Sequence, residues 1–219
     1  MTSTREEQES MMEEDLLQEP EEDQPGREVI IIFAVFFQGG LAPLSLALGW
    51  FFGHPPLERF VWSMRDAIWG VVAAIPMTLM FVGMLRWPIG PLRRVKDFCD
   101  TEVMPLLGSS TWSEIALISL SAGVGEEMLF RGVFQAGLIS WFGVPWGLGL
   151  ASLLFGVLHP ISITYMVIAA FLGLYLGAEW WFLGENLLMV IITHALSDFA
   201  ALAYLIRIRP GIGAGHHSI

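Results

Sequence analysis

The sequence predicts an all-α protein, a polytopic transmembrane helical bundle of about six spans with a disordered acidic N-terminal tail. Hydrophobic residues make up 54% and charged residues 15% of the 219 residues, and the mean hydropathy is +0.60. A water-soluble domain of this size does not carry so much apolar surface. Two uncharged runs, 29–53 and 67–85, are each long enough to cross a hydrocarbon core of about 30 Å.

The first 28 residues differ from the rest in composition. They contain eleven acidic residues and two arginines, a net charge of −9 out of the −11 of the whole chain. Such a segment buries too little apolar surface to offset its chain entropy, so we expect residues 1–28 to form a disordered acidic cytoplasmic tail. A short flexible tail is expected at the other end, over 208–219.

The predicted spans fall into two groups. Segment 29–111 holds the first two helices, at about 29–53 and 66–86, and a basic cytoplasmic loop. Segment 112–207 holds the helical core that carries the candidate site. Its four spans are expected at about 113–139, 145–159, 163–183 and 186–207.

Basic residues indicate the orientation of the bundle. They follow the second span and the last span, at Arg86, Arg93, Arg94, Lys96, Arg207 and Arg209. By the positive-inside rule both regions face the cytoplasm, and with an even number of spans the N-terminus does too. We therefore expect an integral multi-pass protein of the plasma (inner) membrane. Membrane lipids are its immediate partners, and no nucleic-acid partner is expected.

Ionisable residues interrupt three of the predicted spans. They are Glu126, Glu127, Arg131, His159, His194 and Asp198. An unpaired charge in hydrocarbon is costly, so such residues mark a functional site by default. At ~1.5 Å of rise per residue, Glu126 and the residues of the other two spans lie ~14–21 Å in, near the middle of the membrane. The three spans can therefore bring these groups to one buried polar site.

Spacing along the helices suggests different roles for these residues. Glu127 and Arg131 are four positions apart and share a helical face, so an ion pair can neutralise both. Glu126 points about 100° away and lacks that partner, which makes it the candidate general base. His194 and Asp198 are also four apart, so Asp198 can orient the imidazole or present its own oxygen to the site.

Small residues predict close packing of helices at two places. Gly123 and Gly125 directly precede the two glutamates and allow a neighbouring helix to approach, or the backbone to distort. Gly173 and Gly177 share a helical face, and we expect them to pack helices within one chain rather than between subunits.

The buried groups suit peptide-bond hydrolysis. That reaction needs a base that activates water, a donor for the leaving amine and a group that stabilises the oxyanion. The spans contain neither G-x-S-x-G nor H-E-x-x-H, so a serine nucleophile and the zincin arrangement are not indicated. We expect no cofactor. A zinc ion held by His159, His194 and Glu126 is the alternative that stereochemistry allows.

Three short motifs occur in order: Glu126-Glu127-x-x-x-Arg131, Phe155-x-x-x-His159 and His194-x-x-x-Asp198. Together they resemble the signature of the CPBP family, which comprises type II CAAX prenyl endopeptidases and bacteriocin-processing and self-immunity proteins, all multi-span and α-helical. The resemblance covers residues from about 112 to 200. It implies that Glu126 and His159 activate water, that His194 and the residue at 198 stabilise the oxyanion, and that Glu127 and Arg131 support them.

One position departs from the prenyl endopeptidases of this family, which have asparagine where this chain has Asp198. An ionised carboxylate cannot donate to an oxyanion. Either Asp198 is protonated, or it orients His194, or the site holds a cation.

Three functions remain open at this point. The first is an intramembrane endopeptidase of glutamate type, CAAX-protease-like, acting on a peptide or membrane-protein substrate. A prenylated C-terminus, a bacteriocin leader and a membrane-protein segment are its candidate substrates. The alternative is a non-catalytic membrane-binding or bacteriocin-immunity protein on the same scaffold. A proton-coupled transporter is the third, because it too needs carboxylates and histidines within the membrane.

Overall fold

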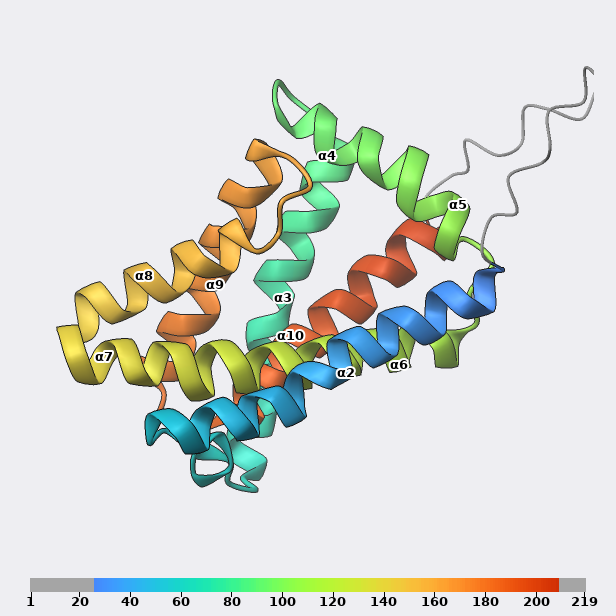
Figure 1. Cartoon of the computed structure of the whole chain (residues 1–219). Helices are drawn as coiled ribbons and strands as arrows, with labels where there is room; N and C mark the ends of the chain where they lie inside the picture. The colour runs from blue at the N-terminus through green and yellow to red at the C-terminus, as the bar shows by residue number, and fades with distance from the viewer. Residues whose placement is uncertain (1–25, 209–219) are drawn as a thin grey trace, which may run out of the picture.

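The structure, a computed structural model, describes residues 26–208. Within this range every regular element is a helix and no strand occurs, as Figure 1 shows. The all-α prediction is therefore confirmed for this part of the chain. The tails predicted over 1–28 and 208–219 lie almost entirely outside the described residues.

Within the described part of the chain, four helices are long and apolar enough to cross a membrane. They are α2 (Arg27–Phe52), α3 (Met64–Arg86), α9 (Ile163–Phe182) and α10 (Leu187–Ala203), the last continued by the π-helix η4 (Tyr204–Ile208). A further long helical segment consists of α6 (Trp112–Glu127), the π-helix η3 (Met128–Gln135) and α7 (Ala136–Phe142). The shorter elements are η1 (Pro56–Arg59), α4 (Leu92–Phe98), η2 (Cys99–Val103), α5 (Met104–Leu107) and α8 (Val144–Val157).

The described residues contain four candidate spans, or five if the bent pair Leu92–Leu107 and Trp112–Phe142 counts as one span. The prediction of six is not met. Helix α8, expected to span over 145–159, has only 14 residues, which is ~21 Å of rise against a hydrocarbon core of about 30 Å. Pro160 lies beyond its end, and proline cannot continue a helix because it lacks the backbone N–H.

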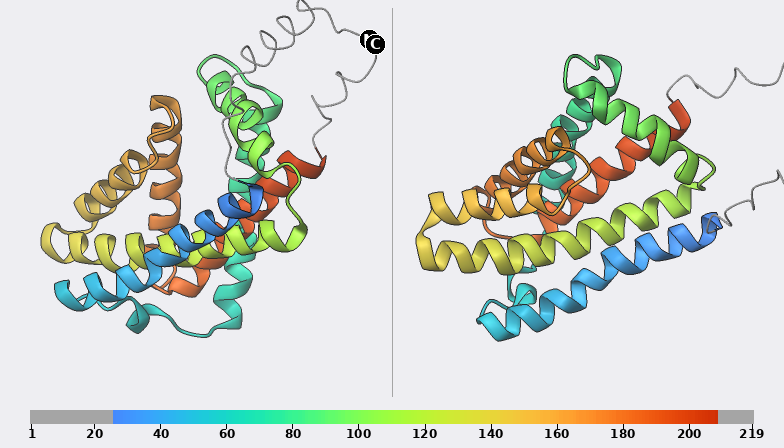
Figure 2. Two further views of the ribbon diagram at one scale, coloured as in Figure 1. Left: turned by 45° about the vertical axis from the view of Figure 1, so that its right-hand side comes forward. Right: turned by 45° about the horizontal axis from the view of Figure 1, so that its top comes forward.

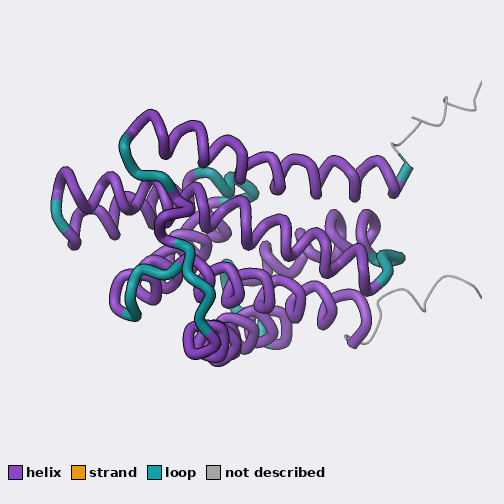
Figure 3. Tube along the Cα trace, turned by 90° about the horizontal axis from the view of Figure 1, so that it is seen from below, coloured by secondary structure: helices purple, strands orange, loops and turns teal. Residues whose placement is uncertain are grey.

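The helices form a bundle around α6 and α10. Helix α10 packs against α3 and α6, while α2 packs against α6 and η3. Figure 2 shows α2 alongside the α6–η3–α7 segment in both views. Helix α8 packs between α7 and α9. Figure 3 shows that helices make up most of the described chain and that loops are short.

Side-chain caps determine where several of these helices begin. Ser63, Thr111, Ser162 and Asn186 each accept a hydrogen bond from a backbone N–H in the first turn of α3, α6, α9 and α10, respectively. Such caps satisfy donors that have no partner within the helix. Thr111 also forms a capping box with Glu114. The caps of α6 and α10 thereby determine the residue at which each of these two helices begins, and these helices carry most of the candidate site.

The glycines before the two glutamates allow close packing, as predicted. A Cβ atom on Gly125 would lie 2.0 Å from the carbonyl oxygen of Gln38 in α2, and one on Gly123 would lie 2.9 Å from the Cβ of Ala195 in α10. Contacts this short are possible only without a side chain. Helix α6 is therefore held tightly between α2 and α10 just before the site.

We expect Gly125→Ala to lower the free energy of unfolding by roughly 1–3 kcal/mol, as overpacking of a well-packed core does. The added methyl group displaces the backbone of α2. Thermal unfolding in detergent micelles measures the effect. Gly39→Ala in α2 is the matched control, because a Cβ there meets no atom within 4 Å. Equal stability of the two variants would contradict the close packing of α2 on α6.

Candidate active site

The structure brings together all six ionisable residues that the sequence singled out. Glu126 and Glu127 end α6, His159 follows the end of α8, and His194 lies in α10. Each histidine has a ring nitrogen within 3.7 Å of a carboxylate from α6. Directly after the two glutamates the helix becomes the eight-residue π-helix η3. Such π-helical turns are rare and are frequent at functional sites.

Glu126 faces His159 within the bundle. The distance from Glu126 Oε2 to His159 Nε2 is 3.7 Å, which is longer than a hydrogen bond but allows both atoms to bind the same water molecule. Only 6% of the Glu126 side chain is exposed. Its Oε2 has no hydrogen-bond partner among the described residues. This carboxylate oxygen is therefore available to a water molecule or a substrate.

The surroundings of His159 determine which ring nitrogen carries its proton. Nδ1 lies 2.6 Å from the carbonyl oxygen of Phe155. Because a carbonyl only accepts, Nδ1 is the donor, and in the neutral ring Nε2 is left as an acceptor toward Glu126. The imidazole also stacks on the Phe155 ring with centroids 4.6 Å apart. Phe155 of the second motif thus orients His159 through its backbone and its ring.

Glu127 and Arg131 form the predicted ion pair, with Arg131 Nη1 2.9 Å from Glu127 Oε1. Both side chains are buried. Arg131 also donates from Nη2 to the carbonyl oxygen of Gly173 in α9, and its guanidinium lies 5.0 Å from the Phe155 ring centroid. The pair therefore compensates a buried charge and connects η3 with α8 and α9.

His194 lies between two carboxylates. Its Nδ1 is 2.7 Å from Glu127 Oε1 and its Nε2 is 3.4 Å from Asp198 Oδ2. A ring with carboxylates at both nitrogens is best satisfied as the imidazolium, which donates from both. The long contact to Asp198 leaves the Nε2–H able to donate to another acceptor. Of the options for Asp198, this geometry favours orientation of His194.

Two buried polar residues, Gln135 and Glu179, were not predicted from the sequence. Gln135 donates to the carbonyl oxygen of Gly177. A Cβ on Gly173 would meet Phe155 and Ser152 of α8. One on Gly177 would meet Leu148 of α8 and Gln135. Both glycines therefore pack α9 within the chain, as expected, mainly against α8. Glu179 accepts a hydrogen bond from Thr193 of α10. It stands near the end of the predicted fifth span, where the rule applied to Glu126 would have identified it.

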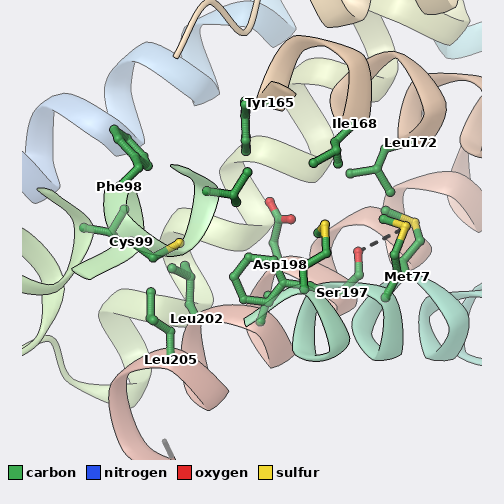
Figure 4. A pocket seen from close by; sticks show the side chains of 16 residues that line it. Met77, Phe98, Cys99, Tyr165, Ile168, Leu172, Ser197, Asp198, Leu202 and Leu205 are labelled. Carbon is green, nitrogen blue, oxygen red and sulfur yellow. Dashed lines mark hydrogen bonds between the residues drawn. The ribbon is translucent and has the colours of Figure 1, made fainter. Parts of the chain in front are cut away.

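A cavity of about 230 Å³ lies beside the site, between α3, α9, α10 and the α4–η2 segment. Its walls are mostly apolar and include Met77, Met80 and Met84 of α3. Figure 4 shows the Asp198 carboxylate in the middle of this cavity. Tyr165, another lining residue, lies with its ring 6.2 Å from that of His159. Two residues that line the cavity are therefore neighbours of the histidines: Asp198 faces His194, and the Tyr165 ring lies near the His159 ring.

The residues as placed do not fit a zinc ion. Among the described residues no group of three or more His, Cys, Asp or Glu side chains could hold a metal. Both ring nitrogens of His194 face carboxylates, and Nδ1 of His159 faces the Phe155 carbonyl. A zinc ion on Glu126, His159 and His194 would have to displace the contact between His194 Nε2 and Asp198, and the three side chains do not converge as placed.

The fold and the site define a polytopic α-helical membrane protein with a buried site of carboxylates and imidazoles. Residues 108–200 match the family model described as type II CAAX prenyl endopeptidase Rce1-like. The matched segment includes all six site residues. This match indicates intramembrane proteolysis of peptide substrates. No curated protein and no solved structure matched the chain.

Proposed function

We propose that this protein is an intramembrane endopeptidase in which Glu126 and His159 activate a water molecule. The observation that carries the proposal is the buried carboxylate of Glu126, whose Oε2 lies 3.7 Å from Nε2 of His159, inside a membrane-spanning bundle. We place the protein in the plasma membrane, with the basic α4 segment and the N-terminus on the cytoplasmic side.

The reaction starts with one water molecule hydrogen-bonded to Glu126 and His159. The carboxylate of Glu126 takes a proton as the water oxygen attacks the peptide carbonyl carbon, and the carbonyl oxygen becomes the oxyanion of a tetrahedral intermediate. The C–N bond then breaks and the protonated pair returns the proton to the leaving amine. No cofactor enters the balance, since water and peptide supply all the atoms of the two products.

In this scheme His194 stabilises the oxyanion with its Nε2–H. The imidazolium is oriented by Glu127 on one side and Asp198 on the other, and preorganised donors of this kind usually contribute a large part of the rate. Arg131 forms an ion pair with Glu127 and thereby holds this carboxylate in place beside His194. Glu127, Arg131 and Asp198 are positioning residues rather than catalytic ones.

Asp198→Asn is expected to retain cleavage within roughly tenfold of the wild type, whereas Asp198→Leu should lose more than about 100-fold, because the oxyanion donor His194 is then no longer oriented on its Nε2 side. Asparagine can still accept from His194 Nε2 or donate to the oxyanion itself, and leucine can do neither. Steady-state rates on one peptide substrate compare the two variants. Equal loss in both would show that the charge of Asp198, and not its hydrogen bonding, is needed.

A chelator such as 1,10-phenanthroline is expected to leave the cleavage rate unchanged, because the site residues as placed do not converge on a metal. Rates before and after extensive dialysis against the chelator are the measurement. Loss of activity that zinc restores would contradict the mechanism proposed here.

The cavity suggests the chemistry of the substrate. Its lining is apolar except for a few groups such as Asp198 and Ser197, so it suits an apolar side chain or a hydrocarbon tail next to the cleaved bond. Mass-spectrometric mapping of new peptide termini, in membranes that contain the wild type or Glu126→Gln at matched levels, tests the function without a chosen substrate. Termini found only with the wild type support proteolysis; identical sets of termini from two folded proteins would refute it.

A further inference from the structure

A second cavity, of about 460 Å³, lies between α3 and α9 at the ends of these helices that are remote from α4. Val72 and Pro76 are part of its α3 wall, and Ala178 and Phe182 are part of its α9 wall. Val72 and Phe182 are also among the exposed apolar residues. Because both helices are candidate spans, this cavity opens toward the hydrocarbon of the bilayer.

A hydrogen bond between α3 and α9 lies between this cavity and the one beside the active site. Tyr175 of α9 donates to the carbonyl oxygen of Ala73 in α3 at 2.9 Å, and both residues line the second cavity. The first cavity lies along the same two helices, between Met77 and Met84 of α3 and Tyr165 of α9. None of the six ionisable site residues lines the second cavity, so its occupant need not be the substrate.

The polar feature of the second cavity is Glu179. This residue is 7% exposed, and its Oε1 accepts from the Thr193 hydroxyl at 2.6 Å. Its Oε2 has no hydrogen-bond partner among the described residues. A buried carboxylate oxygen without a donor is unfavourable in a protein and more so within a membrane. The terminal torsion of a glutamate side chain is soft, so Oε2 can turn toward the cavity without movement of the backbone.

Depth and charge limit the ligands that could satisfy Glu179. The residue lies three positions before the end of α9, or ~4.5 Å along the helix axis, which places its carboxylate near the boundary between hydrocarbon and headgroups. A primary ammonium group offers three N–H donors to a carboxylate, a quaternary ammonium offers none, and an anionic headgroup is repelled. The apolar walls suit acyl chains.

We propose that this cavity binds a membrane phospholipid with a primary ammonium headgroup, which donates to Glu179 while its acyl chains lie along α3 and α9. The occupant comes from the bilayer because the cavity lies between two spanning helices. This lipid site is independent of the proposed protease function, and the lipid would connect α3 with α9 beside the hydrogen bond that Tyr175 already makes between these helices.

Native mass spectrometry of the purified full chain tests the proposal. Phosphatidylethanolamine, phosphatidylcholine and phosphatidylglycerol with identical acyl chains are titrated one at a time. We expect phosphatidylethanolamine to bind about tenfold more tightly than phosphatidylcholine, the size of effect typical of a hydrogen bond to a charged group. Glu179→Gln should remove this preference. Glu185→Gln, a matched change at the same end of α9, should keep it.

Equal affinity for the first two lipids in the wild type would overturn the proposal, as would a preference that survives in Glu179→Gln or tightest binding of phosphatidylglycerol. Circular dichroism and size-exclusion chromatography establish that each variant is folded. If Glu179→Gln does not fold, lipid binding by Ala178→Leu tests the proposal instead, because this variant keeps the carboxylate and fills the cavity. It is expected to weaken phosphatidylethanolamine binding by about tenfold, and unchanged binding would show that the lipid lies elsewhere.

Discussion

Replacement of Glu126 by glutamine is expected to lower the rate of peptide cleavage by roughly 10²–10⁴-fold, the usual contribution of a positioned general base. Glutamine has nearly the same size and keeps an acceptor oxygen, but it cannot take a proton from water. Because Glu126 makes no ion pair as short as that of Glu127, the substitution should leave the fold intact. A rate measured on a peptide identified by terminus mapping gives the comparison.

The control for this experiment is Glu58→Gln, the same chemical change at an exposed position in η1, which should cleave at the wild-type rate. Each alternative function predicts another outcome. A non-catalytic immunity protein would protect cells equally well with Glu126→Gln, and a transporter would lose proton-linked flux without any cleavage by the wild type. Undiminished cleavage by the variant would exclude Glu126 as the base.

The second large effect is expected on stability. Arg131→Met should lower the free energy of unfolding by about 3–5 kcal/mol, the typical loss when one partner of a buried ion pair is removed. The variant leaves Glu127 with His194 alone, and His194 also faces Asp198, so one cation remains for two carboxylates. The side chain further loses its hydrogen bond to Gly173. Equilibrium unfolding in mixed detergent micelles measures the difference.

Two further variants distinguish the stability that is lost because the ion pair is buried from the stability that is lost whenever a cation is removed. Lys96→Met breaks an ion pair of the same i,i+4 spacing with Asp100, but one that is partly exposed; it should cost only about 0.3–0.5 kcal/mol. Glu127→Gln combined with Arg131→Met should recover part of the stability lost in Arg131→Met, because the uncompensated carboxylate is gone. If Lys96→Met and Arg131→Met cost the same, burial of the ion pair is not what makes it important.

Interactions between residues close in sequence could be predicted without a structure. The apolar runs predicted membrane helices, because chain segments without charge over about 20 residues have few other stable solutions. The Glu127–Arg131 pair followed from helical periodicity alone, since residues four apart share a face. Packing within the chain at Gly173 and Gly177 was also expected, although its main partner, α8, was not.

Two features went beyond what periodicity could show. Helix α8 was predicted as a span over 145–159, and its 14 residues agree with that length, but so short a helix does not cross the hydrocarbon core. Glu179 was overlooked because it stands near a predicted span end, where a charged side chain can reach water. In the structure it is buried against Thr193 instead.

The sequence by itself determined the class of the protein, the helices and the residues available for chemistry, because composition and helical spacing are properties of neighbouring residues. The resemblance implied that Glu126 and His159 act together, but the contacts of Glu126 with His159 and of Glu127 with His194 are established only by the packed bundle. These two contacts join residues 33 and 67 positions apart, and they depend on how each helix is rotated about its own axis. That rotation follows from packing, such as the approach of α2 at Gly125, and no local pattern encodes it.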